Sequence, residues 1–98
     1  MWGMIARITT VAGKRNEMIS ILQSSANAMP GCLSYIVATD QSADEVLWVT
    51  ETWEDQAAHD AALSLRQVQD AVPRARSLVA NFERIAMTNP VWSAEPNR

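Results

Sequence analysis

Polar and apolar residues alternate along some segments of the chain and recur at helical spacing along others, which predicts a mixture of strands and helices. The segments that alternate or are rich in β-branched residues predict four strands, at Met4–Val11, Cys32–Thr39, Glu45–Trp53 and Asn81–Thr88. The second and third of these are joined by a short polar turn, residues 40–44, so we expect them to form a hairpin.

Two segments carry the helical spacing. The first is predicted at Lys14–Met29 and is stopped by Pro30-Gly31. The second begins after Asp55, a plausible N-cap, and its apolar stripe continues to Val79. Pro73 lies inside that stripe, and a proline removes a backbone donor and clashes with the preceding turn. We therefore expect Pro73 to kink this helix or to open a second one.

The resulting order is β-α-β-β-α-β, which is the α+β, ferredoxin-like arrangement of a four-stranded antiparallel sheet with both helices on one face. The length of 98 residues fits one domain, residues 1–98, in which we expect residues 90–98 to form a loose tail. The second face of such a sheet is bare. We expect a homodimer, which requires only that this face be apolar and self-complementary.

The composition of the chain excludes several classes of binding partner. The net charge is −3 and the sequence has no basic stripe, so no nucleic-acid partner is expected. No apolar stretch approaches the roughly 18 residues that a membrane span needs, so no membrane association is expected. Cys32 is the only cysteine, which fits a reducing, cytoplasmic location. With one histidine, one cysteine and dispersed acidic residues, no metal site is expected. The sequence has no glycine-rich phosphate loop, so no nucleotide-type cofactor is expected either.

Short motifs add a family resemblance that covers nearly the whole chain. They are Ala12-Gly13-Lys14-Arg15, Pro30-Gly31-Cys32-Leu33-Ser34-Tyr35, Glu51-Thr52-Trp53-Glu54-Asp55, Ala57-Ala58-His59-Asp60 and Val79-Ala80-Asn81-Phe82. With these motifs the chain resembles the antibiotic biosynthesis monooxygenase (ABM) family of dimeric α+β barrels. The resemblance implies that two sheets close face to face across a homodimer, with a pocket between each sheet and its helices.

The resemblance also implies a function. Some members of the family oxidise polycyclic phenols or quinols with dioxygen and use neither metal nor flavin, whereas others degrade heme. The Asn, Trp and His used by the heme-degrading members have no counterpart at the matching positions here. We therefore expect a cofactor-independent monooxygenase that acts on a small aromatic phenol or quinol. The alternative is a non-catalytic dimer of the same fold that binds a small molecule or mediates an interaction.

Three residues of the third strand are candidates for substrate binding. Trp53 is either a pocket wall that stacks on a flat substrate or a core anchor between helix and sheet. Glu51 and Val49 share its strand face. Glu51 either serves the pocket or forms a structural ion pair with Arg7. Val49 stands where phenol-oxidising relatives often carry an Asn.

His59, Tyr35 and Arg74 are the candidate catalytic residues. The reference pKa of His59, about 6.5, suits removal of a phenol proton. On one continuous helix, however, His59 points roughly 130° away from the apolar stripe, toward solvent, a pocket edge or the partner chain. Many relatives carry their histidine nine residues after the tryptophan, where this chain has Ala62.

The other two catalytic candidates have alternatives of the same kind. Tyr35 either donates a hydrogen bond to a substrate oxygen or packs in the second strand. Arg74, with Arg76, either holds an anionic phenolate or superoxide or is an ordinary solvated helix residue.

Overall fold

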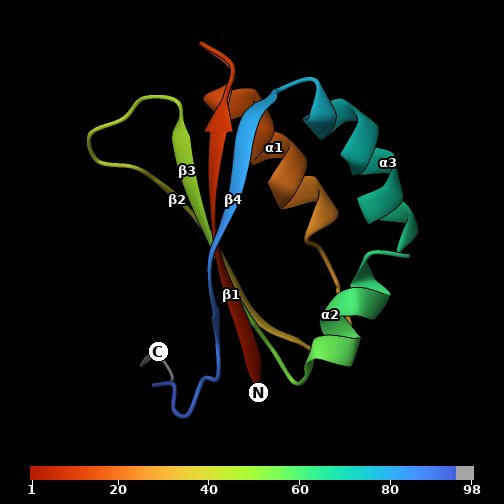
Figure 1. Ribbon diagram of the computed structural model, residues 1–98. Helices are drawn as coiled ribbons and strands as arrows, with labels where there is room; N and C mark the ends of the chain where they lie inside the picture. Colours follow the sequence, from red (N-terminus) through yellow and green to blue (C-terminus); the bar gives the residue numbers. More distant parts are fainter. Residues whose placement is uncertain (95–98) are drawn as a thin grey trace.

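The computed structural model describes residues 1–94 and consists of one sheet covered on one face by three helices (Figure 1). The strands are β1 (Trp2–Thr10), β2 (Cys32–Thr39), β3 (Val46–Trp53) and β4 (Val79–Thr88). They pair antiparallel in the order β2-β3-β1-β4. The helices are α1 (Arg15–Ser25), α2 (Gln56–Ala62) and α3 (Arg66–Arg76). The predicted α+β, ferredoxin-like sheet with its helices on one face is confirmed.

The core lies between the two central strands and the helices. Along β3 buried and half-buried residues alternate from Val46 to Trp53, as the sequence pattern predicts. The β1 residues Met4, Ala6 and Ile8 are buried on the same face of the sheet. Of these, Ile8 packs in one cluster with Met18 and Ile21 of α1, Ala71 of α3, Leu47, Val49 and Leu78. Burial of this apolar surface, at about 25 cal/mol per Å², holds the helices on the sheet.

The second helical segment is broken, but the prediction of Pro73 as the break point is wrong. The break falls between Ala62 and Arg66, where successive N–H groups at residues 63–65 bond three residues back. The extended backbone of Leu65 then starts α3. This helix continues through Pro73 to Arg76. Pro73 and Gln69 are both exposed, so the carbonyl that proline leaves unpaired is open to solvent.

The first helix is shorter than predicted, since it ends at Ser25 rather than Met29. The hydroxyls of Ser24 and Ser25 donate to the carbonyls of Ile21 and Leu22. Such side-chain bonds compete with the backbone ladder and favour a helix end. Three residues later Ala28 adopts a left-handed backbone, with φ at 52°.

A tight junction places the start of α2 beside the start of β2. Asp55 caps α2 as predicted, because its Oδ1 accepts a hydrogen bond of 2.8 Å from the N–H of Ala58. Gly31 has a positive φ of 80°, and a Cβ built there would lie 2.6 Å from Cβ of Ala58. The N–H of Glu54 donates to the carbonyl of Gly31 at 2.9 Å. Only a glycine allows this approach.

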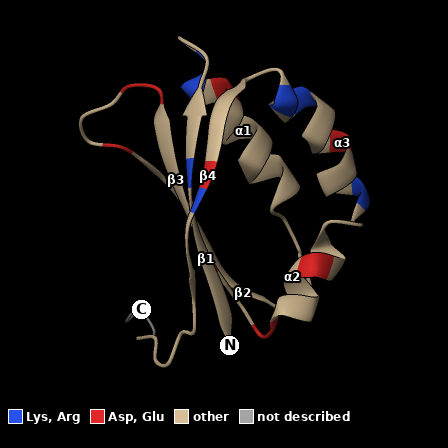
Figure 2. Cartoon of the chain, in the orientation of Figure 1, with Lys and Arg blue, Asp and Glu red and all other residues tan. Residues whose placement is uncertain are grey.

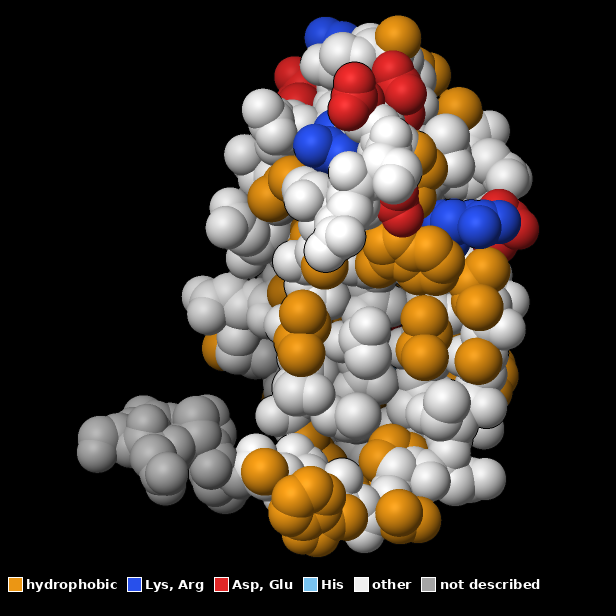
Figure 3. Space-filling model, turned by 90° about the vertical axis from the view of Figure 1, so that its left-hand side faces the viewer, with side chains coloured by type: hydrophobic (Ala, Val, Ile, Leu, Met, Phe, Trp, Pro, Cys, Tyr) orange, Lys and Arg blue, Asp and Glu red, His pale blue; other side chains and the backbone are white. Residues whose placement is uncertain are grey.

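The other sheet face, here called the open face, has no helix over it among residues 1–94 (Figures 1 and 3). The strand register places Ile36, Thr50, Ile5 and Ala86 in one row across this face. Figure 3 shows apolar side chains over much of the face and charged ones gathered toward one end. In Figure 2 charged residues occur mainly on the helices, near the turns and in the middle of the sheet.

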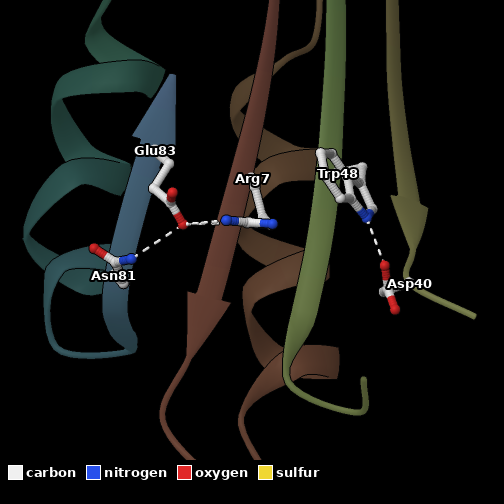
Figure 4. A network of polar contacts seen from close by, with 5 residues as sticks. All are labelled: Arg7, Asp40, Trp48, Asn81 and Glu83. Atoms are coloured by element: carbon white, nitrogen blue, oxygen red, sulfur yellow. Dashed lines mark hydrogen bonds and ion pairs between the residues drawn. The ribbon is translucent and has the colours of Figure 1, made fainter. Parts of the chain in front are cut away.

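A polar network crosses the middle of the open face (Figure 4). Arg7 donates to Oε1 of Glu83 through Nε at 3.1 Å and Nη2 at 2.8 Å, and its guanidinium lies 5.5 Å from the Trp48 ring centre. Nε1 of Trp48 donates to Asp40 at 2.8 Å. The predicted pairing of Arg7 with Glu51 is therefore wrong. Arg7 lies beside Trp48 on the open face, whereas Glu51 points to the helices.

Beyond β4 the structure describes residues 89–94, which form neither helix nor strand. The predicted loose tail, residues 90–98, thus falls partly within this segment, and residues 95–98 lie outside the described residues. No helix in the part of the chain that the structure describes is long and apolar enough to cross a membrane.

Candidate active site

A cavity of about 570 Å³ lies between the helices and the helix-facing side of the sheet. Most of its lining is apolar and comes from all three helices and all four strands. Its ionisable lining residues within residues 1–94 are Tyr35, Glu51, His59, Arg76 and Arg84. A largely apolar cavity with a few converging polar groups is the usual form of a small-molecule site.

The cavity opens to solvent near the edge strand β4. Leu63, Val72 and Phe82 all line it, and each is about half-exposed. Leu63 follows α2, Val72 lies on α3 and Phe82 lies on β4. A residue that both lines a cavity and reaches solvent marks its mouth. A small molecule can therefore enter between the helices and β4.

Trp53 is both buried in the core and part of the cavity wall. Its side chain is only 1% exposed, among the most buried of the described residues, and it also lines the cavity. The alternation of β3 turns Trp53 and Glu51 to the same side. There the indole Nε1 donates to Oε1 of Glu51 at 3.0 Å. A buried indole needs such an acceptor, so this bond fixes both the ring and the carboxylate.

Glu51 is a carboxylate in a largely apolar setting. Burial raises the pKa of its side chain above its ordinary value, and this effect outweighs the opposing ones. The opposing effects come from the hydrogen bond of Trp53 and from the positive charges of His59 and Arg84. Each of these favours the charged form, while removal from water disfavours it.

His59 is buried, so of the three surroundings expected for it, solvent, a pocket edge or the partner chain, the structure shows the pocket and excludes solvent. It is 8% exposed and lines the cavity. Its ring centre lies 4.6 Å from that of Trp2, and it meets Trp53 edge-on at 5.6 Å. Its Nδ1 lies 3.0 Å from Oδ1 of Asp60. The break after α2 explains why the helical pattern did not predict the burial of His59. The apolar stripe used for the prediction spans two helices with different phases.

The orientation of α2 also places His59 near the position at which many relatives are expected to carry a histidine. Ala62, nine residues after Trp53, is buried and lines the cavity. His59 precedes it by three residues, which is close to one helical turn, so both side chains face the same side. The histidine is displaced along the helix but stays on the cavity side.

Tyr35 also lines the cavity and lies opposite Glu51 in the pairing of β2 with β3. Burial raises the pKa of its hydroxyl far above the ordinary value, and the negative charge of Glu51 adds to the effect. The phenol therefore keeps its proton at all physiological pH values. Tyr35 can donate a hydrogen bond to a ligand oxygen and cannot act as a base.

Arg74 lies apart from the other candidates. It is exposed on α3 and borders a separate pocket, together with Glu17, Ser20 and Ser77. Of the six candidate residues, Tyr35, Val49, Glu51, Trp53 and His59 line the cavity, and Arg74 does not. The arginines that line the cavity are Arg76, at the end of α3, and Arg84, on β4.

Two residues of the site escaped the sequence analysis. Trp2 packs against His59 with the two rings tilted by 39°, and its place in the alternation of Met4, Ala6 and Ile8 was a usable signal. Arg84 lines the cavity opposite Ala6, next to a register shift between β1 and β4. Because the shift interrupts the alternation of β4, the sequence pattern alone does not assign Arg84 to a face.

Metal-binding groups and the single cysteine complete the description of the site. Within residues 1–94 no three His, Cys, Asp or Glu side chains are grouped so that they could hold a metal ion. Cys32 is free and half-buried. Burial raises the pKa of its thiol, and the negative charge of Glu51 adds to this.

Comparison with known proteins identifies the family. The sequence model of the antibiotic biosynthesis monooxygenases matches residues 1–74. The chain belongs to the antibiotic biosynthesis monooxygenase family. A candidate antibiotic biosynthesis monooxygenase from Chloroflexus aurantiacus is 40% identical, with a TM-score of 0.92 and 96% of each chain covered.

More distant structures share the fold of this ABM protein. A protein from Pseudomonas aeruginosa has a TM-score of 0.81 at 20% identity, with 93% of this chain and 94% of that one covered. A candidate antibiotic biosynthesis monooxygenase from Deinococcus radiodurans has a TM-score of 0.78 at 20% identity, with 100% of both chains covered. No curated protein matches the sequence. The predicted family is confirmed.

Proposed function

We propose that this ABM protein is a monooxygenase that oxidises a phenol- or quinol-type aromatic small molecule with dioxygen, without metal or flavin. The observation that carries the proposal is the cavity itself. Its apolar lining suits aromatic rings, and its ionisable groups include Glu51, which is hydrogen-bonded to the cavity wall Trp53. Family membership supports the reaction type, and the cavity supports the class of substrate.

The proposed oxidation requires only a few groups from the protein. Loss of the hydroxyl proton makes the substrate an electron-rich anion, which reduces dioxygen directly. One oxygen atom then enters the substrate, and the other leaves as water with two substrate hydrogens. An apolar cavity excludes bulk water and strengthens the electrostatic interactions within it.

We assign the roles by position. Trp53 and Val49 hold the aromatic rings, and Glu51 contacts a polar group of the substrate. Tyr35 donates a hydrogen bond to a substrate oxygen, and His59 assists from α2. Arg74 lies outside the cavity, so we transfer its expected role, holding an anion, to Arg84 and Arg76, which line it.

We also propose that the protein acts as a homodimer joined through the open face. The row of Ile36, Thr50, Ile5 and Ala86 provides a mostly apolar strip that a second copy can cover. Across a twofold axis the same patch meets itself, as such an interface requires. Two sheets joined in this way leave both cavities on the outer sides of the barrel.

Oxygen uptake tests the proposed activity. Purified, metal-stripped protein is mixed with anthrone- and naphthoquinol-type substrates while dissolved oxygen is followed with an electrode. We expect oxygen consumption above that of buffer and of heat-denatured protein. Trp53→Phe and His59→Ala should slow it, whereas Gln69→Ala on the exposed surface of α3 should not. Absence of acceleration across a broad panel would rule out the activity.

A binding function is the second candidate, and one observation favours it. Val49 and Ala62 stand at positions where relatives carry an Asn and a His, and in this structure both line the cavity as apolar side chains. A cavity without those polar groups suits retention of a ligand. A small molecule that co-purifies unchanged, with no oxygen uptake, would favour this function over oxidation.

A further inference from the structure

We infer that Glu51 is the proton acceptor of the site, and that the cavity takes an aromatic alcohol in its neutral form with the hydroxyl on Oε2 of Glu51. This inference rests on the proposed function, because it names the group that makes the reactive anion. Its binding part can be tested without turnover.

The two oxygens of Glu51 differ in their surroundings. Oε1 accepts the hydrogen bond of Trp53, and no described residue donates to Oε2. Every side-chain oxygen or nitrogen of residues 1–94 that is sealed from solvent has a hydrogen-bond partner. Oε2 is therefore not sealed, and since Glu51 lines the cavity, its open side is the cavity.

Glu51 is also the only carboxylate among the described residues that line the cavity. The residue is just 7% exposed, so little solvent competes for Oε2. An acceptor in this position is satisfied by a ligand that brings a hydroxyl donor. A ligand that brings its own negative charge is repelled.

The groups around Glu51 set its basicity. From β2 it faces Tyr35 and Cys32, whose raised pKa values keep both neutral. From α2 it faces His59, and from β4 it faces Arg84. Burial raises the pKa of Glu51 despite the opposing effects of these two residues, which makes it a stronger base than an ordinary carboxylate.

His59 is less suited to the same task. One ring nitrogen is engaged with Asp60, and the ring packs between Trp2 and Trp53. These contacts hold the imidazole as part of the cavity wall. We therefore assign His59 the role of positioning the Trp53–Glu51 pair.

The proton transfer is balanced within the site. The O–H bond of the substrate breaks, the proton moves to Oε2, and the electron pair stays on the substrate oxygen. The negative charge thereby moves from Glu51 to the phenolate, and the total charge of the cavity does not change. Arg84, which lines the same cavity, favours the phenolate electrostatically.

The test uses 4-nitrophenol, whose electron-poor ring resists oxidation and whose ionisation is visible by absorbance. Its dissociation constant is measured from pH 4 to 9. For the natural chain we expect a bell-shaped dependence of the affinity on pH. On the acid side, here called the acid limb, affinity rises as Glu51 ionises, and on the alkaline side it falls as the probe becomes an anion. In Glu51→Gln the acid limb should disappear, and affinity at neutral pH should fall about tenfold, as expected for a lost charge-assisted hydrogen bond.

Two further variants complete the experiment. Glu54→Gln removes an exposed carboxylate three residues away and outside the cavity lining, so it should leave the bell unchanged. Arg84→Gln removes a cation that holds down the pKa of Glu51, so the acid limb should move to higher pH. If circular dichroism shows that Glu51→Gln is unfolded, Arg84→Gln decides the question.

The outcomes separate this inference from the proposed function. An unchanged pH profile in Glu51→Gln overturns the inference, even in a protein that consumes oxygen. An acid limb that stays in place in Arg84→Gln overturns it as well. A bell that Glu51→Gln abolishes supports the inference, and if no substrate is oxidised, only the proposed function fails.

Discussion

At the scale of single residues, Glu51 has the largest consequences because its charge is buried among apolar side chains. Burial raises its pKa above an ordinary value of 4.5. The folded protein therefore binds this proton more tightly than the unfolded chain does. Glu51 stabilises the fold most below the unfolded pKa, and that contribution is lost as pH rises through the folded pKa.

We predict that Glu51→Gln becomes more stable relative to the natural chain as pH rises. Glutamine keeps an oxygen that can accept the hydrogen bond of Trp53 and removes the charge that burial disfavours. The difference in free energy of unfolding should be smallest near pH 4 and should grow toward pH 8. Urea denaturation at several pH values measures it.

Glu54→Gln is the control for this experiment, because it makes the same chemical change at an exposed site. A stability difference for Glu51→Gln that is flat from pH 4 to 8, or that shrinks as pH rises, contradicts the prediction. A flat difference would mean that the effects of the indole, His59 and Arg84 balance burial at this carboxylate, and a shrinking difference would mean that they outweigh it.

Strand periodicity was sufficient to place Glu51, Val49 and Trp53 on one face. It did not reveal that Trp53, rather than Arg7, is the partner of Glu51. Pairing across strands depends on register, and the register places Arg7 beside Trp48 on the opposite face of the sheet. His59 was left with three possible surroundings, solvent, a pocket edge or the partner chain, for a related reason. Helical phase is a local quantity, and it was carried across the break between α2 and α3.

At the scale of elements, the junction of β2 with α2 depends on Gly31. Gly31 and Gly13 have nearly equal positive φ values, 80° and 77°, but only Gly31 has a close neighbour, Ala58. These two glycines therefore separate the effect of backbone conformation from that of packing.

We predict that Gly31→Ala destabilises the protein more than Gly13→Ala does. Both should lose about 1–2 kcal/mol because alanine is disfavoured in the left-handed region. Gly31→Ala should lose more, because its Cβ would lie 2.6 Å from that of Ala58 and push α2 away. Thermal and urea unfolding measure both variants. Equal losses would show that the junction yields without strain.

Pro73 offers a second prediction at this scale. It lies inside α3, so the carbonyl four residues earlier, that of Gln69, has no N–H to accept. We predict that Pro73→Ala increases the free energy of unfolding by about 1–3 kcal/mol, since proline is much the poorest residue for a helix interior. Urea denaturation measures the change.

Gln69→Ala, at another exposed position of α3, is the matched control for helix propensity. A loss of stability in Pro73→Ala would contradict the prediction. It would show that the proline shapes α3 to fit the sheet, where Ala71 and Ala75 contact the core.

At the scale of the whole molecule, the fold leaves one sheet face open and encloses a cavity under the other. The cavity faces the helices, and the row through Ile36 and Ile5 faces the opposite side. The proposed dimer interface and the proposed ligand site therefore lie on different surfaces, and each can be disturbed without the other.

We predict that Ile36→Glu converts a dimer into a monomer. Ile36 is 56% exposed and lies on the open face, so a charge there would be buried in the dimer. Leu63→Glu is the matched control, because Leu63 is also 56% exposed but lies at the cavity mouth. Light scattering at micromolar concentration should give a dimer for the natural chain and for Leu63→Glu. A monomeric natural chain would contradict the proposed interface.

The sequence by itself determined the element order, the fold class, the family and the shared face of Glu51 and Trp53. The elements and the shared face follow from periodicity and turn residues, which are local and repeat along the chain, and the family follows from the resemblance that the short motifs carry. Only the tertiary structure decided which candidates meet. It brought His59 against Trp2 and Trp53, left Arg74 outside the cavity and put Arg84 in its lining. Such contacts depend on strand register, a helix break and a register shift, which couple residues far apart in the chain and leave no periodic trace in it.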